Sequence, residues 1–337
     1  MKLRSYGISA AFLLALGLVA YGQEDPFRGK TLTITIGYAQ AGNSDVIGRL
    51  VARHLPKHLP GNPVGIASNM PGAGSLRAAN FLFNQAPRDG SSLAIITPTV
   101  GIDEALGVPA VQYRARDFTW IGRVAVVLQP IAAFAHSQVR SFADLYKVDM
   151  PVASTGVVSP SDAYPRLLNG VLGTKFKTVT GYTSSNDSLL AMERKEVDGG
   201  LVSWNTLKLT KASEIDRGEI RPLVQFTLAR SKDLPDTPTS VEVGRTEEEK
   251  DILRFYTAAE DIGRSILGPP GMPPERIIMM RKAFGEMMGD PEFLEEVRRL
   301  QLEFAPLSGS ELEKLARSTT DVSAKTIAGA KRVMTAP

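Results

Sequence analysis

Residues 31–45 read TLTITIGYAQAGNSD, and this stretch decides how the chain begins to fold. Apolar residues alternate with threonine over 31–36, which predicts a strand, and apolar residues recur at helical spacing from Val46 to Leu55, which predicts a helix. The residues between the two elements are small and polar, so we expect a tight turn. The first N–H groups of such a helix lack an intrahelical acceptor and lie at the positive end of its dipole. The junction therefore predicts a place where an anion, especially a carboxylate, can bind.

The same order of strand, polar turn and helix recurs along the chain. A second small polar turn, 155–161, also follows a short strand and precedes a helix. Such alternation predicts an α/β protein with parallel sheets and helices on their faces. The expected strands are 31–36, 64–68, 92–97, 151–154, 177–180, 197–203 and 221–226, with one or two more inside 120–135. The expected helices are 46–55, 76–85, 162–172, 184–193, 247–256, 274–288, 291–300 and 310–333, the last beginning at a capping-box pair, Ser308 and Glu311.

Length and composition favour a soluble protein of one large or two medium domains. The chain has 337 residues, of which 43% are apolar and 22% are charged, as in ordinary globular proteins. It has no cysteine, which excludes disulfides, thiolate nucleophiles, cysteine-based metal sites and a lipidated N-terminal cysteine. A large exported protein without disulfides fits a bacterial periplasm, since its core is big enough to need no cross-links.

The N-terminus predicts export. Lys2 and Arg4 precede a short uncharged apolar run, 8–20, and Ala20 and Gly22 suit a signal peptidase. We expect a signal peptide over 1–22. The alternative, a membrane anchor, is less favoured because the run is shorter than the roughly 20 residues that span a bilayer. Loss of two cations with the signal lowers the formal net charge from +3 to +1, and no concentrated basic region predicts nucleic-acid binding.

The motifs of catalysis and cofactor binding are missing. His54 and His58 are four residues apart on an expected helix, but no third ligand is evident, so we predict no metal site. Residues 72–77, GAGSLR, lack the third glycine of a dinucleotide loop. No serine has the flanking residues of a nucleophile elbow. Asp45 and Asp162 are interpreted as braces of helix starts. We therefore expect no cofactor and no enzymatic activity.

Five segments resemble, in order, the landmarks of one family. They are GYAQAGNSDVIGR at 37–49, NMPGAGS at 69–75, APRDG at 86–90, LPDTP at 234–238 and LGPPGMP at 267–273. Together they resemble the solute receptors of tripartite tricarboxylate transporters, the Bug-type receptors. The resemblance extends over nearly all of the chain that follows the predicted signal.

The resemblance implies a two-lobed α/β fold of the class II periplasmic-binding-protein kind, with mostly parallel sheets flanked by helices and a cleft between the lobes. It places lobe 1 at 23–125 plus 232–337 and lobe 2 at 126–231. It implies a periplasmic receptor, expected to be a monomer, which captures a di- or tricarboxylate or an aromatic acid and delivers it to membrane transporter subunits. A ligand-sensing receptor for a signalling partner is the first alternative, and an α/β hydrolase or dehydrogenase is the second.

The resemblance also implies ligand-binding residues in four segments. The first segment departs from the family pattern, with Gly37-Tyr38 in place of Pro-Phe and Ala41-Gly42 in place of a double glycine, and the last has Ser203-Trp204-Asn205 where many relatives carry an aspartate. Trp204 is expected either at the ligand or in the core. The expected contacts are Tyr38, Gln40, Ala41, Gly42, Asn43, Ser44 and Asp45; Thr97, Pro98 and Thr99; Ser154, Thr155, Gly156, Ser159 and Ser161; and Ser203 and Trp204.

Overall fold

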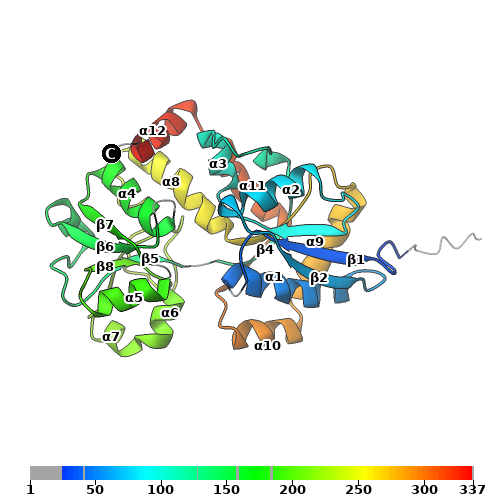
Figure 1. Cartoon of the computed structure of the whole chain (residues 1–337), viewed down its shortest axis with the longest axis horizontal. Coiled ribbons are helices and arrows are strands. Elements are labelled where there is room, and N and C mark those ends of the chain that lie inside the picture. Colours follow the sequence, from blue (N-terminus) through cyan, green and yellow to red (C-terminus); the bar gives the residue numbers. More distant parts are fainter. Residues whose placement is uncertain (1–24, 41, 127, 157–158, 183–184, 336–337) are drawn as a thin grey trace, which may run out of the picture.

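The chain folds into two α/β lobes that lie side by side (Figure 1). The computed structural model describes residues 25–335 except 41, 127, 157–158 and 183–184. The predicted signal, 1–22, lies outside the described residues. Each lobe is built on one sheet, so the predicted two-lobed α/β fold is confirmed.

The first lobe contains a six-stranded sheet of order β11-β4-β10-β3-β1-β2. Strand β1, next to the edge strand β2, pairs in parallel with both β2 and β3. Strand β10 runs antiparallel to β3 and β4, and β11 runs antiparallel to β4. The strands are β1 (Thr31–Ile36), β2 (Val64–Asn69), β3 (Ser92–Ile95), β4 (Thr119–Ala125), β10 (Arg264–Gly268) and β11 (Phe304–Ser308).

The second lobe contains a five-stranded sheet of order β7-β6-β8-β5-β9. Strand β6 is parallel to β7 and β8, and β5 is antiparallel to β8 and β9. The sheets are thus mixed and not mostly parallel as expected, because β10 and β11 run against the other strands of the first sheet and β5 runs against those of the second. The strands are β5 (Pro130–Ala133), β6 (Met150–Ser154), β7 (Phe176–Thr180), β8 (Gly199–Leu201) and β9 (Arg221–Gln225).

Helices cover both sheets. They are α1 (Asn43–His54), α2 (Leu76–Asn84), α3 (Val100–Leu106), α4 (Pro160–Leu172), α5 (Ser185–Glu193), α6 (Trp204–Thr210), α7 (Ala212–Asp216), α8 (Glu247–Ile262), α9 (Pro274–Met288), α10 (Pro291–Arg299), α11 (Gly309–Thr320) and α12 (Ala324–Thr335). A short 3-10 helix, η1 (Leu55–His58), continues α1.

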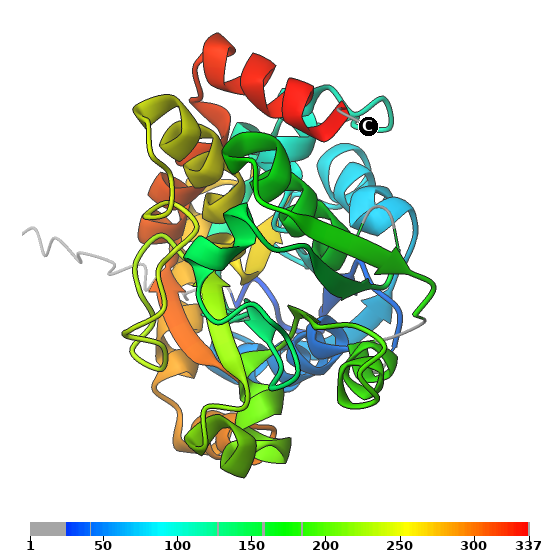
Figure 2. The same cartoon turned by 90° about the vertical axis from the view of Figure 1, so that its left-hand side faces the viewer.

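Two of the C-terminal helices join the second lobe. Leu253 of α8 and Ala330 of α12 belong to the same apolar cluster as Ile131 and Val152 of the second sheet. Figures 1 and 2 show α12 at the top of both views, over α4 and α8. Strands β10 and β11 nevertheless return to the first sheet. The proposed lobe boundaries therefore stay a prediction, with α8 packed against both lobes.

Several predicted elements differ in extent. The single helix expected over 310–333 is two helices, α11 and α12, because the backbone leaves the helical region at Asp321 and the chain turns toward α4. The strand expected over 197–203 is only Gly199–Leu201. Strands β10 and β11 were not expected. Strand β11 contains Pro306. A proline argues against an interior strand, but it is tolerated at the edge position that β11 occupies.

Candidate functional site

The junction of β1 and α1 has the geometry that the sequence predicts. Gly42 precedes the helix with an extended backbone, φ −85° and ψ 165°, and no side chain of the described residues caps the helix start. Gly42 and Asn43 are exposed and Ser44 is buried. Because the first N–H groups of a helix have no intrahelical acceptor, the amino-terminal end of α1 presents donors without a side-chain cap. Ala41 lies outside the described residues.

Asp45 braces this loop from behind. Its carboxylate pairs with Arg49 Nε at 3.0 Å and accepts a hydrogen bond of 2.8 Å from Asn69 Nδ2. Asn69, at the end of β2, also donates to the carbonyl oxygen of Tyr38 at 3.0 Å. The interpretation of Asp45 as a brace is confirmed, and its buried carboxylate fixes the loop while the helix end stays uncapped.

A pocket of about 190 Å³ lies between α1 and α6, that is, between the lobes. Asn43 and Ile47 line it from the first lobe, and Ser203 and Asn205 from the second. The expected contacts Asn43 and Ser203 therefore meet at one pocket. Ser203 Oγ accepts a hydrogen bond of 3.3 Å from the N–H of Thr206 and so caps α6.

Trp204 lies in the core. Its side chain is 5% exposed and belongs to an apolar cluster with Leu128 and Phe134. Of the two places expected for Trp204, the structure shows the core. The carboxylate of Glu303, from the loop before β11, accepts a hydrogen bond of 2.6 Å from the N–H of Leu128 in the crossover segment. Burial raises the pKa of Glu303, which also accepts a hydrogen bond from the N–H of Asn205.

The second polar turn satisfies much of its own hydrogen bonding. The N–H of Thr155 donates to Ser161 Oγ at 3.0 Å, and the N–H of Gly156 donates to Ser154 Oγ at 3.2 Å. Ser159 Oγ donates to the Gly156 carbonyl at 2.7 Å. These two amides are occupied in this conformation, so a ligand that bound them would have to exchange with serine hydroxyls.

The β3–α3 segment lies beside Tyr38. Thr97 hydrogen-bonds the Tyr38 side chain, and Thr97 Oγ1 lies 2.6 Å from Thr99 Oγ1. Thr99 Oγ1 in turn donates to Asp103 Oδ2 at 2.8 Å. Burial raises the pKa values of both Tyr38 and Asp103. The expected contacts Tyr38, Thr97 and Thr99 are thus linked by hydrogen bonds. Pro98 is buried and Gln40 is exposed.

A polar cluster between the lobes was not expected. Tyr164 of α4 donates a hydrogen bond from its hydroxyl to Glu260 of α8, and its ring stacks on Phe226 with centroids 4.1 Å apart. Burial raises the pKa of Glu260, against the opposing effects of Tyr164 and Arg264. The charges of Glu260 and Arg264 also act on the pKa of Tyr38, which connects this cluster to the β1–α1 loop.

Arg264 is the unusual member of this cluster. Its side chain is half-buried at the start of β10, and its Nε is buried without a hydrogen-bond partner. Among the described residues, no hydrogen bond or ion pair of Arg264 is found. The sequence carries one signal of the cluster, since Glu260 follows Tyr256 by one helical turn on a face that is otherwise apolar. Nothing local identifies Arg264.

Two α/β lobes that share a polar cluster and a pocket define a two-lobed ligand-binding protein. The family described as the tripartite tricarboxylate transporter family receptor matches residues 47–330. The chain belongs to this family, which confirms the predicted resemblance and makes it a solute-binding receptor. No helix in the described part of the chain is both long and apolar enough to cross a membrane.

The chain is also similar to individual proteins, and the solved structures among them share its fold. The chain is 32% identical over 246 residues to the UPF0065 protein of the TAR-I ttuE-ttuC' intergenic region of Agrobacterium vitis, covering 71% of this chain and 68% of that one. The ligand-free TctC solute-binding protein from Polaromonas is 19% identical, with a TM-score of 0.67 over 87% of this chain and 96% of that one. MatC from Rhodopseudomonas palustris, solved with bound malate, is 20% identical, with a TM-score of 0.60 over 90% and 99%.

Proposed function

We propose that this protein is an exported periplasmic receptor that captures a small carboxylate between its lobes and delivers it, unchanged, to a tripartite membrane transporter. Family membership supports the receptor role. The single observation that supports a carboxylate ligand is Arg264, a half-buried cation with no hydrogen bond or ion pair among the described residues. The charge of Arg264 lowers the pKa of Glu260, so that carboxyl compensates it only through longer-range attraction. An anionic ligand would supply the direct hydrogen bonds that the guanidinium lacks.

The end of α1 offers the second positive position. The helix dipole and the uncapped N–H groups near Asn43 favour an anion there. Tyr38, which immediately precedes this loop, experiences the charge of Arg264. A ligand with two acidic or polar ends could therefore contact Arg264 with one end and the α1 amides with the other. This arrangement favours a dicarboxylate, and the malate complex of MatC is an example of that ligand class on this fold.

The expected affinity follows from these contacts. Each hydrogen bond to a charged group contributes about 1.5–3 kcal/mol. A few of them, with apolar burial, reach the roughly −8 kcal/mol of a micromolar complex. Only a closed arrangement lets both lobes contact the ligand, so binding favours closure.

Calorimetric titration of the purified protein with a panel of acids tests the proposal. The panel contains malate, adipate, citrate, benzoate and glutamate, with the matched diamide of malate as an uncharged control. We expect at least one dicarboxylate to bind at micromolar concentration and the diamide not to bind. Binding of the diamide as tightly as malate, or no binding of any acid, would contradict the proposal.

A further inference from the structure

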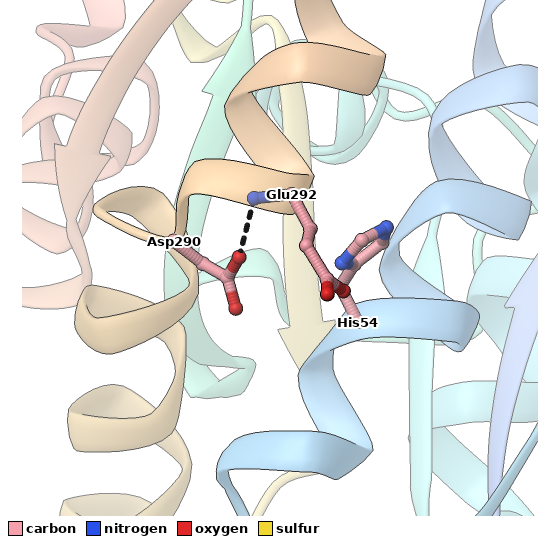
Figure 3. Close-up of side chains that lie close together, drawn as sticks. All are labelled: His54, Asp290 and Glu292. Carbon is pink, nitrogen blue, oxygen red and sulfur yellow. Dashed lines mark hydrogen bonds between the residues drawn. The ribbon is translucent and has the colours of Figure 1, made fainter.

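A second cluster of ionisable side chains lies away from the cleft, where the end of α1 and η1 meet the start of α10. Single ligand atoms of His54, Asp290 and Glu292 all lie within 4.8 Å of one another. Figure 3 shows the Glu292 carboxylate directed toward the imidazole ring of His54, with Asp290 beside them. The sequence could not reveal this group, because its acidic members follow the histidine by more than 230 residues.

The environment of His54 leaves one ring nitrogen without a partner. Nε2 lies 3.0 Å from Glu296 Oε1. A carboxylate accepts hydrogen bonds, so Nε2 is the donor in this contact. Nδ1 then presents a lone pair. This atom is buried and has no hydrogen-bond partner among the described residues, and the side chain is only 2% exposed.

The two carboxylates beside this lone pair are positioned by α10. Asp290 caps the helix, with Oδ1 accepting from the N–H of Glu292 at 2.8 Å and that of Phe293 at 3.3 Å. Its Oδ2 lies 3.0 Å from His58 Nε2, without hydrogen-bond geometry. Glu292 Oε2 pairs with the exposed Lys57 at 2.7 Å.

We propose that this cluster binds a divalent transition-metal ion of the zinc class. An imidazole lone pair and two carboxylates that face one another all attract a cation placed between them, and the exposed Lys57 compensates only Glu292. Nitrogen and oxygen ligands together suit Zn²⁺ and its first-row neighbours better than Mg²⁺ or Ca²⁺, which prefer oxygen alone.

The proposed ligands are His54 Nδ1, Asp290 and Glu292, and water completes the shell. His58 is near enough to Asp290 to serve as a further ligand. Glu296 orients His54 through its other nitrogen, as carboxylates behind metal-bound histidines commonly do. Binding would separate Glu292 from Lys57. The ion would then hold α10 against the end of α1, which gives it a structural role.

Titration of the chelator-stripped protein with Zn²⁺ tests this proposal. We expect one equivalent to bind, a higher Tm, and a visible absorption band when Co²⁺ replaces Zn²⁺. Glu292→Gln removes a proposed ligand at an exposed position, so the variant should keep its metal-free Tm and lose about tenfold or more in Zn²⁺ affinity. Asp290→Asn retains a helix-capping oxygen and should weaken binding likewise.

Two control variants separate this site from adventitious binding. Glu295→Gln changes an exposed carboxylate on the same helix, and His136→Gln changes a histidine of the second lobe. Both should bind Zn²⁺ as the wild type does. The proposal is overturned if the wild type binds no Zn²⁺, or if Glu292→Gln and Asp290→Asn bind it with wild-type affinity, which would indicate an adventitious ion only.

Discussion

Replacing Arg264 by methionine should abolish much of the ligand affinity while leaving the fold intact. The guanidinium has no hydrogen bond or ion pair among the described residues, so its removal costs only its longer-range attraction to Glu260. The pairing of Arg264 with Ala125 in the sheet is made by the backbone and survives the substitution. Methionine retains an unbranched stem. The desolvation cost of a half-buried cation opposes its attraction to Glu260, so Tm should change little.

The expected loss follows from the bonds that a guanidinium makes to a carboxylate. Hydrogen bonds to charged groups contribute about 1.5–3 kcal/mol, which corresponds to a roughly 10- to 150-fold increase in Kd. Arg264→Lys keeps the charge but not the planar fork that binds a carboxylate through two N–H groups. We therefore expect the lysine variant to bind with an affinity between those of the wild type and Arg264→Met.

Calorimetric titration with the best-binding acid of the panel measures these affinities. Arg254→Met is the control, because Arg254 lies on α8, pairs with Asp251 and is 47% exposed. It should bind as the wild type does. If Arg264→Met binds with unchanged affinity, Arg264 does not contact the ligand. If it instead loses more than about 2 kcal/mol of stability, the guanidinium has a structural partner and the reasoning is wrong.

Three other substitutions test separate parts of the structure. In Gly42→Val the new side chain enters open space at a φ of −85°, which valine tolerates, so circular dichroism should stay native. The same side chain blocks the α1 amides, so calorimetry should detect no ligand binding. Binding at full strength would show that this helix end is not the ligand site. Burial raises the pKa of Glu260 above its ordinary 4.5, so this group contributes stability at low pH that is lost as pH rises through the folded-state pKa. In Glu260→Gln the unfolding free energy, measured with urea, should therefore fall less steeply above pH 4.5 than in the wild type. An equally steep fall in the variant would show that other groups cause the pH dependence. A Cβ at Gly65 would lie 1.8 Å from the Ala52 carbonyl oxygen, so Gly65→Ala should lower the unfolding free energy by several kcal/mol. The control Gly285→Ala has open space in α9 and should raise the unfolding free energy by up to ~1 kcal/mol. Equal effects of the two substitutions would show that α1 can shift away from β2.

Local chemistry explains what the sequence could predict. The strand, turn and helix of 31–54 are decided by neighbours in the chain, so alternation and helical spacing suffice to place them. The Ser308–Glu311 capping box is likewise local, and both of its hydrogen bonds are present. The family resemblance rests on such turns. Their short loops of small residues have few alternative conformations, so their sequences can be recognised locally.

Contacts between distant segments explain what could not be predicted. Tyr164, Phe226 and Glu260 come together only because α8 packs against the second lobe. The break at Asp321 has no glycine or proline to mark it. Its one local signal is Ser323, whose Oγ accepts from the N–H of Thr326 and caps α12, while the packing of α11 on β4 and of α12 on α4 sets the change of direction. The sequence also could not predict which amides of the two turns are free to bind a ligand. This depends on side-chain rotamers that a sequence does not specify.

The two polar turns differ in a way that bears on how capture proceeds. At α1 no side chain caps the helix, so an anion can bind without displacing any described side-chain cap. At the second turn, Thr155 and Gly156 already donate to serine hydroxyls. Exchange of these two bonds for bonds to a ligand costs about 0.5–1.5 kcal/mol each before any gain. We therefore infer that the first lobe binds the ligand first, and that the second lobe contributes only where its new bonds exceed those it gives up.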